Sequence, residues 1–134
     1  IRPDYTSSPD DNVILEGVSS TVGSLGWVGY SFAQEAADAG RAKLLAVSTD
    51  DGGDCVVPTP ETIASADFPI SRFLYTYVNA EAAATDPSVA AFVDYMMSDV
   101  GLESVSAVGY VDLSDLDQNL AQAIWVNRTT GRQW

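Results

Sequence analysis

Apolar and polar positions follow two different periods along the chain, and the changes between them predict the elements. Helices are predicted where a capping residue precedes apolar residues at helical spacing, or where the chain is rich in Ala and Glu. These segments are about 11–20, 31–39, 60–66, 87–96, 102–107 and from 115 onward. Short runs of β-branched, aromatic and other apolar residues predict strands at 25–28, 43–48 and 71–79, with a further extended piece at 110–113. Residues 1–10, rich in Pro, Ser and Asp, are expected to be irregular.

Several helix boundaries rest on single residues. Thr59 and Asp86 are expected to be N-caps, each followed by a proline at the first helical position. Gly40 is expected to end the second helix, and Gly101 to break the helix that begins at Pro87. That helix carries an apolar stripe at helical spacing, which predicts a core face: Val89, Phe92, Val93 and Met96.

The last predicted helix opens at Ser114, with Asp117 three residues later as a box-like partner. Its inner face is expected to consist of Leu116, Leu120, Ala123 and Ile124. Strands that alternate with helices indicate an α/β layer architecture. Three convincing strands are few for a self-sufficient sheet, so the pattern indicates a piece of something larger. Ile1 is not an initiator Met, so the chain is expected to begin at a processed or truncated end.

The stretch VGSLGWVGY (22–30) has glycines three residues apart, at Gly23, Gly26 and Gly29. It is neither the G-x-G-x-x-G dinucleotide fingerprint nor a P-loop. A phosphate cradle needs small residues with free N–H groups, whereas here large apolar residues fill the gaps. The stretch therefore favours a buried strand whose glycines permit close packing.

Charge and residue usage exclude several functions. Nineteen acidic against six basic residues give a net charge of −13, which disfavours binding to nucleic acid or anionic membranes. The interpretation is an acidic solubility surface, with a hint of high salt; a cation-binding surface is the alternative. The chain has no histidine, which excludes Ser-His-Asp and Cys-His catalysis and the commonest zinc sites. The single cysteine, Cys55, is expected to be a small buried residue.

Three local motifs have ordinary interpretations. The run TDDGGD (49–54) departs from calcium-loop spacing and predicts a solvated turn. Asp112, Asp115 and Asp117 fit the electrostatics of a helix start before they fit a metal site, and Asn127-Arg128-Thr129 is a glycosylation sequon that is common by chance. We expect no metal, no cofactor and no catalytic residue. Ser71 and Arg72 pair a hydroxyl with a permanent cation and are candidates for contact with an anion; an exposed charge at a strand end is the alternative.

Four segments in order carry a resemblance to a known family. They are GSLGWVGYSFA (23–33, after DDNV at 10–13 and Gly17-Val18), PTPETI (58–63), FPISRFLYTYVN (68–79) and VGYVDL (108–113). Together they resemble the phosphate-binding proteins of ABC transporters, which have a Gly-x-x-Gly-aromatic-x-x-Tyr strand and PSPETV-, YPLSRPLFIYVN- and VGYVPL-like segments. One departure is Phe73, where the family often has proline.

The resemblance implies a type II periplasmic-binding-protein-like α/β fold, of which this chain is the C-terminal portion. It implies that residues 1–68 end the second lobe, 69–72 cross at a hinge, and 73–134 return to the first lobe. The family's main phosphate contacts lie in N-terminal segments that include a Ser-Gly-Thr, which this chain lacks. None of them can therefore be carried over, and Ser71 and Arg72 stay as cleft or hinge candidates.

The implied function is phosphate binding for ABC import by closure of a cleft, with no enzymatic activity. The implied partners are phosphate, the N-terminal portion of the same protein and a transporter permease. The implied location is periplasmic or extracellular, for a protein that is either free or lipid-anchored. This chain alone is expected to bind phosphate weakly or not at all. Two alternatives stay open, an interaction module on the same scaffold and a phosphate-scavenging phosphatase; the missing histidines count against the second.

Overall fold

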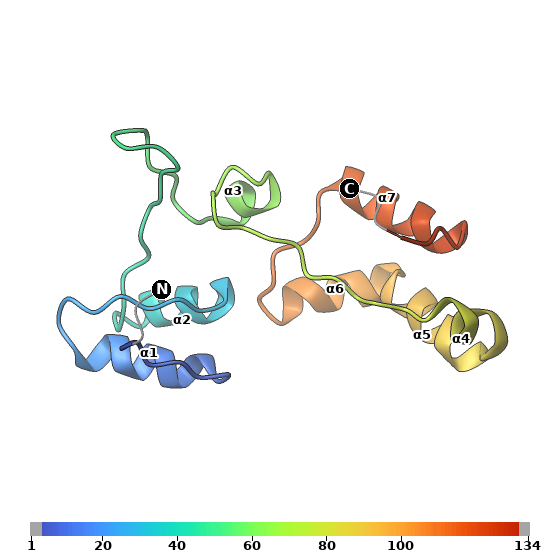
Figure 1. Ribbon diagram of the computed structural model, residues 1–134, viewed down its shortest axis with the longest axis horizontal. Coiled ribbons are helices and arrows are strands. Elements are labelled where there is room, and N and C mark those ends of the chain that lie inside the picture. The colour runs from blue at the N-terminus through green and yellow to red at the C-terminus, as the bar shows by residue number, and fades with distance from the viewer. Residues whose placement is uncertain (1–3, 132–134) are drawn as a thin grey trace. The chain divides into compact units, whose positions relative to one another are not determined.

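The computed structural model describes residues 4–131, so Arg2, Arg132 and the first three residues of the predicted lead-in lie outside it. Seven helices occupy this part of the chain (Figure 1): α1 (Asp11–Ser20), α2 (Tyr30–Asp38), α3 (Pro60–Ala64), α4 (Ala80–Thr85), α5 (Pro87–Met96), α6 (Asp99–Ala107) and α7 (Asp115–Val126). The chain divides into two compact units, residues 1–58 and residues 59–134.

In the first unit, α1 packs against α2. Asp10 caps α1, because its Oδ1 accepts a hydrogen bond of 2.9 Å from the N–H of Asn12. Gly40 follows the C-cap of α2 with a φ of +67°, and the N–H groups of Gly40 and Arg41 donate to the carbonyls of Ala37 and Ala36. This is a Schellman motif, which a glycine enters without strain. The prediction that Gly40 ends this helix is confirmed.

In the second unit, α4 packs against α5, and α5 packs against α6. The predicted caps are confirmed: Thr59 begins α3 with a capping box, Asp86 begins α5, and Ser114 begins α7. Helix α4 was not predicted. Its signal is Asn79 before the run AEAAAT, and Asn79 Oδ1 accepts a hydrogen bond of 2.9 Å from the N–H of Ala82.

The prediction that Gly101 breaks a helix is wrong. The break lies at Met97 and Ser98, and Ser98 caps α6 by accepting from the N–H of Gly101 at 3.3 Å. Gly101 is buried inside α6, where an added Cβ would meet the carbonyl oxygen of Tyr95 and, at 2.8 Å, that of Met96. The glycine therefore allows α6 to begin directly against the end of α5, a tertiary role that helix propensity does not reveal.

Within residues 4–131, the three predicted strands do not pair with one another. The one β-bridge in this part of the chain is antiparallel and joins Val47 to Val56 of the following segment. The N–H and carbonyl groups of these two residues exchange two hydrogen bonds of 2.9 Å. Segments 25–28 and 71–79 join no ladder. A strand exists only against a neighbour that accepts and donates its backbone hydrogen bonds. The described residues supply no such neighbour, although the apolar pattern of the segments is that of strands.

Because the predicted strands do not form a sheet here, few side chains are buried. Several predictions of core positions are therefore wrong for this chain. The buried hydrophobic residues of the described part are Leu15, Ala36, Phe68, Ala83 and Val93. Of the predicted core stripe only Val93 is buried. Its neighbour Phe92 is 62 % exposed, Trp27 in the glycine-rich stretch is 74 % exposed, and Leu116 on the predicted inner face of α7 is 77 % exposed. Cys55, expected to be buried, is also exposed. These positions are apolar at the right spacing, but nothing in the described residues covers them.

None of the helices in the described part combines the length and apolar character that a membrane span needs.

Candidate functional site

Ser71 and Arg72 follow a turn at the start of segment 71–79. The N–H of Ser71 donates to the carbonyl of Phe68 at 3.0 Å, and Pro69 occupies the second position of this turn. Ser71 is half-buried and Arg72 is exposed. Within residues 4–131, neither the Ser71 hydroxyl nor the Arg72 guanidinium makes a hydrogen bond or ion pair. Both groups are therefore available to a ligand or to another part of a larger protein.

Segment 71–79, which begins with Ser71 and Arg72, has no helix or strand assignment. Phe73 and Tyr75, two residues apart, form an edge-to-face pair with ring centroids 6.3 Å apart. This is the alternation of an extended backbone, in which neighbouring side chains point to opposite sides. If the backbone is also extended at residues 71 and 72, their side chains point to opposite sides, so we expect Ser71 and Arg72 not to hold one anion together.

Gly26 in the glycine-rich stretch has a packing role. An added Cβ would meet Cγ2 of Val18 and, at 3.1 Å, Cγ2 of Ile14, both on α1. Gly26 is thus closely approached, but the prediction of a buried strand with two backbones in close contact is wrong, because the neighbours are side chains of a helix and the stretch is exposed. Leu25 and Trp27, on either side of Gly26, stay exposed.

The backbone N–H of Gly29 faces a carboxylate of the same chain. Gly29 is the N-cap of α2, and its N–H donates to Asp11 Oδ2 at 3.3 Å. A helix N-terminus attracts anions through its unpaired N–H groups and its dipole. Here a carboxylate lies at that position already, so phosphate would be repelled. The stretch is therefore not a phosphate loop in this structure.

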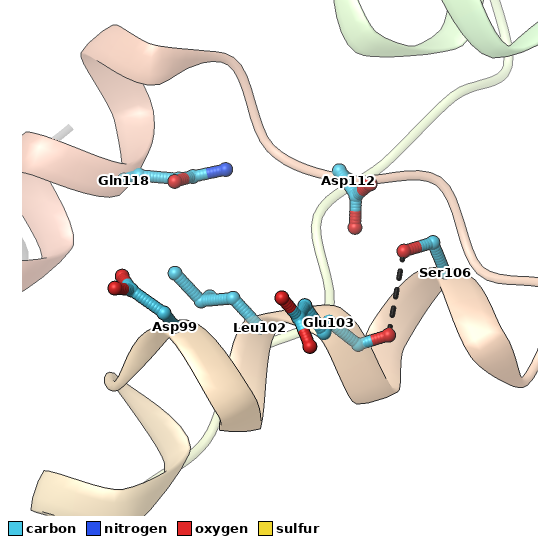
Figure 2. Close-up of a pocket in the computed structure, with 6 residues that line it drawn as sticks. All are labelled: Asp99, Leu102, Glu103, Ser106, Asp112 and Gln118. Carbon is cyan, nitrogen blue, oxygen red and sulfur yellow. Dashed lines mark hydrogen bonds between the residues drawn. The ribbon is translucent and has the colours of Figure 1, made fainter.

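A pocket of about 280 Å³ lies between α6 and the segment that leads into α7. Figure 2 shows the residues that line it: Asp99, Leu102, Glu103 and Ser106 on α6, Asp112 on the connecting segment, and Gln118 on α7. Three of these side chains are carboxylates, which repel an anion. In the described part of the chain no group of three or more His, Cys, Asp or Glu residues could hold a metal ion. The pocket therefore supports neither a phosphate site nor a metal site.

The remaining acidic motifs keep their ordinary interpretations. Segment 49–54 is an exposed turn, in which Gly52 has a φ of +78° and the N–H of Gly53 donates to the carbonyl of Asp50 at 3.1 Å. The predicted solvated turn is confirmed. At the start of α7, the Ser114 hydroxyl donates to Asp117 Oδ2 at 2.6 Å and accepts from the N–H of Asp117 at 3.2 Å. Asp117 thus acts as the expected partner of the cap.

The pKa of Glu61, in the PTPETI segment, is lowered by its surroundings. Hydrogen bonds from its own backbone N–H and from the Thr59 side chain lower the pKa of this carboxyl below the usual 4.5. The side chain is fully exposed to solvent. A lowered pKa on an exposed carboxyl at a helix start is an ordinary capping effect, and it does not mark a catalytic acid.

Cations are scarce in the second unit. No lysine or arginine lies between Arg72 and Arg128, while eight acidic residues do: Glu81, Asp86, Asp94, Asp99, Glu103, Asp112, Asp115 and Asp117. The guanidinium of Arg128 stacks 3.3 Å from the centroid of the Trp125 ring, and its Nη1 donates to the Trp125 carbonyl at 2.9 Å. Arg72 is therefore the cation of residues 59–131 that is free to meet an anion.

Sequence reasoning missed two contacts that organise the units. One is the Asp11–Gly29 hydrogen bond. The other joins α7 to α5, where Trp125 Nε1 donates to Asp94 Oδ1 at 2.6 Å. The partners are 18 and 31 residues apart, and no local pattern in the sequence links residues at such separations.

The profile of the PBP superfamily domain matches residues 7–100. The chain belongs to the PBP superfamily. The solved structure of a protein from Planctomyces limnophilus, described as a possible phosphate binding protein, superposes on 96 % of this chain and 45 % of its own, with a TM-score of 0.69 and 29 % identity. The expectation of a partial periplasmic-binding-protein-like fold is thus confirmed, although residues 4–131 form only the single bridge between Val47 and Val56.

The curated relatives agree. Protein SphX of Synechocystis is 33 % identical over 90 % of this chain and 35 % of its own length. The phosphate-binding protein PstS of Pseudomonas aeruginosa is 27 % identical over 84 % of this chain and 33 % of its own, and that of Staphylococcus saprophyticus is 30 % identical over 85 % and 34 %. The chain thus spans about a third of the length of these relatives. The two PstS proteins are named as binding proteins, in agreement with the expectation of a binding protein and not an enzyme.

Proposed function

We propose that this chain is part of a two-lobe protein that binds phosphate and delivers it to an ABC importer. The observation that carries the proposal is similarity to phosphate-binding relatives along most of the chain, with 84 % of it matched by the Pseudomonas aeruginosa protein. The acidic surface of the chain does not argue against phosphate binding. Phosphate can be held by backbone N–H groups, hydroxyls and a single arginine in an enclosed cleft, which needs no basic surface.

The proposed mechanism is closure of a cleft between two lobes. Phosphate binds the closed state better than the open one and shifts the population toward it. We propose that residues 1–68 belong to the second lobe, 69–72 to the hinge crossing, and 73–134 to the first lobe. The Pro69 turn followed by segment 71–79 is compatible with a crossing at this point. This lobe assignment rests on the family resemblance and is independent of the two compact units.

We place the main phosphate contacts in the preceding, N-terminal part of the protein. In the described residues, the N-terminus of α2 faces Asp11, and the pocket beside α6 is lined by carboxylates. Ser71 and Arg72 are the candidates that this chain contributes, because both side chains are unengaged in residues 4–131. Since we expect them not to hold one anion together, we propose that one of them reaches the cleft and the other stays at the hinge.

The remaining parts of the proposal follow from the family. The protein works without a cofactor, outside the cytoplasmic membrane, and its partners are phosphate, its own N-terminal portion and a permease. Nucleic acid is not a partner, because a net charge of −13 repels it.

The test uses a hybrid protein in which this chain replaces the matched 45 % of the Planctomyces limnophilus protein. We expect titration calorimetry to show one phosphate site with a dissociation constant at about the micromolar level or tighter. A folded hybrid that gives no heat with phosphate, although the intact Planctomyces limnophilus protein binds it, would contradict the proposal. Hydrolysis of p-nitrophenyl phosphate by the chain would instead favour the phosphatase alternative.

A further inference from the structure

The turn after α7 carries a sequence motif that the proposed function does not use. Asn127-Arg128-Thr129 is the one Asn-x-Ser/Thr sequence among the 134 residues, and α7 ends directly before it at Val126 (Figure 1). Such a motif accepts N-linked glycans when x is not proline and when it lies at the surface of a secreted protein. The motif by itself is common by chance, so its surroundings decide whether it is usable.

All three residues of the motif are exposed, and they lie outside the helix. Arg128 has a φ of +53°, and its guanidinium stacks 3.3 Å from the centroid of the Trp125 ring. The long side chain in the middle of the motif is thus held against α7. It does not shield Asn127 and Thr129, which stay open to solvent. The two residues that a glycosylating enzyme must reach are therefore accessible in this structure.

The fold makes little use of the two polar side chains of the motif. Asn127 Nδ2 donates one hydrogen bond of 2.8 Å, to the carbonyl of Ala123, and an amide nitrogen has a second N–H to spare. Within residues 4–131, the Thr129 hydroxyl makes no hydrogen bond. The backbone N–H of Thr129 does, since it donates to the carbonyl of Ile124 at 3.0 Å. The turn thus needs the backbone at position 129 but not the hydroxyl, which is the group that the acceptor motif requires.

We infer that Asn127 is the attachment site of an N-linked glycan. The inference rests on the location outside the cytoplasmic membrane that the proposed function includes, and not on phosphate binding. The co-reactant is an oligosaccharide linked to a polyprenyl diphosphate, and an oligosaccharyltransferase brings the two together. Asn127 Nδ2 forms a bond to C1 of the first sugar, and the bond between C1 and the diphosphate oxygen breaks. The lipid diphosphate leaves with the electron pair, and the amide loses one proton, so nothing is oxidised or reduced.

Attachment is compatible with the contacts that hold the end of α7. One hydrogen of Asn127 Nδ2 is replaced by the sugar, and the other can keep the bond to the Ala123 carbonyl. The hydrogen bond from Trp125 to Asp94 and the stacking of Arg128 on Trp125 use other atoms. A glycan is bulky and solubilising and belongs on a surface. The turn after α7 provides such a position without a change in the fold.

The first experiment is peptide mass spectrometry of the protein purified from the cells that produce it. Peptides that contain Asn127 should carry the added mass of an oligosaccharide on that residue. Peptides that contain Asn119 serve as the internal control, because Asn119 lies on the same helix and is followed two residues later by Ala121, which has no hydroxyl. They should be unmodified. An unmodified Asn127 in protein recovered from outside the cytoplasmic membrane would overturn the inference.

The second experiment tests the folded 134-residue chain in vitro. Purified oligosaccharyltransferase and a polyprenyl-diphosphate-linked oligosaccharide should raise the intact mass of the chain by one glycan. Thr129→Ala should abolish the modification and leave the circular dichroism unchanged, because the Thr129 hydroxyl makes no hydrogen bond within residues 4–131. Thr129→Ser is the matched control: it keeps a hydroxyl and should keep the modification. Equal modification of the alanine and serine variants would overturn the inference. So would a chain that stays unmodified while a short Asn-x-Thr peptide reacts in the same mixture.

The inference and the proposed function fail separately. A hybrid protein that gives no heat with phosphate, together with a glycan on Asn127, contradicts phosphate binding and leaves the attachment site in place. Phosphate binding with an unmodified Asn127 does the reverse. A protein found only in the cytoplasm would overturn the attachment site together with the proposed location.

Discussion

Gly26 is the residue that fixes the glycine-rich stretch against α1. We predict that Gly26→Ala destabilises the chain by about 1–3 kcal/mol, because the new methyl group would overpack against the β-branched Val18 and Ile14. Urea unfolding followed by circular dichroism measures the free energy of unfolding. Gly17→Ala is the control: Gly17 lies inside α1 with open space around its Cα, so this change should be neutral or stabilise by up to about 1 kcal/mol. Equal effects of both changes would show that Gly26 has no packing role.

Glu61 reports on the start of α3 through its pKa. Thr59→Ala removes a hydrogen bond to the ionised carboxylate, so the pKa of Glu61 should rise toward 4.5, while Thr59→Ser should leave it low. Carboxyl chemical shifts in an NMR titration measure this pKa.

The lowered pKa of Glu61 also sets the direction in which the free energy of unfolding changes with pH. Because the pKa of Glu61 is lower in the folded state, its contribution is present above pH 4.5 and is lost as the pH falls through the folded value. A Thr59→Ala protein with an unchanged Glu61 pKa would contradict the assigned cause.

Arg72 is the residue of this chain that we expect to influence phosphate most. In the hybrid protein, Arg72→Ala should weaken phosphate binding by about tenfold if the guanidinium reaches the anion, since a charge-assisted hydrogen bond is lost. Ser71→Ala should then have little effect, because we expect the two side chains not to hold one anion together. Calorimetry measures both affinities. If neither change alters the affinity, both residues belong to the hinge and all anion contacts come from the remainder of the protein.

At the scale of elements, a single side chain ties α7 to α5. We predict that Trp125→Phe and Asp94→Ala show a coupling of about 1 kcal/mol in a double-mutant cycle, because each removes the same 2.6 Å hydrogen bond. Phenylalanine keeps an aromatic ring beneath Arg128, so the stacking contact is retained. The free energies of unfolding in urea provide the cycle. Additive effects would mean that the hydrogen bond does not hold α7.

Helix starts could be predicted from the sequence because their causes are local. Thr59, Asp86 and Ser114 each accept hydrogen bonds from N–H groups two or three residues later, and Gly40 adopts its left-handed conformation within a six-residue motif. Gly101 was misread because its small size is required by the carbonyl groups of α5, a contact between helices. Local sequence patterns therefore predict helix caps, but they do not predict contacts between helices.

Strands and core could be predicted only as tendencies. Segment 71–79 has a strand's composition, and Val89, Phe92, Val93 and Met96 have the spacing of a core face. Pairing and burial, however, require partners that the described residues do not provide. Ser71 and Arg72 could be chosen as candidate anion-binding residues from their residue types alone, but the directions of their side chains depend on the backbone conformation. The identity of the anion contacts could not be predicted, because the family motif that supplies them is not in this sequence.

At the scale of the whole molecule, a net charge of −13 accompanies exposed apolar side chains. Tyr77 and Leu116 lie open to solvent, while 19 acidic residues keep separate copies apart. We expect this repulsion to reduce association between copies through the exposed apolar faces. If the proposed function holds, we expect the same negative field to restrict phosphate to an enclosed site that is not lined by carboxylates.

Paired calorimetric titration with inorganic phosphate tests the central claim most directly. The 134-residue chain alone should give no binding heat up to about millimolar phosphate, whereas the hybrid protein should saturate at one phosphate per molecule with a dissociation constant at about the micromolar level or tighter. Tight binding by the chain alone would contradict the assignment of the main contacts to the remainder of the protein. A folded hybrid that does not bind phosphate would contradict the phosphate-binding function itself.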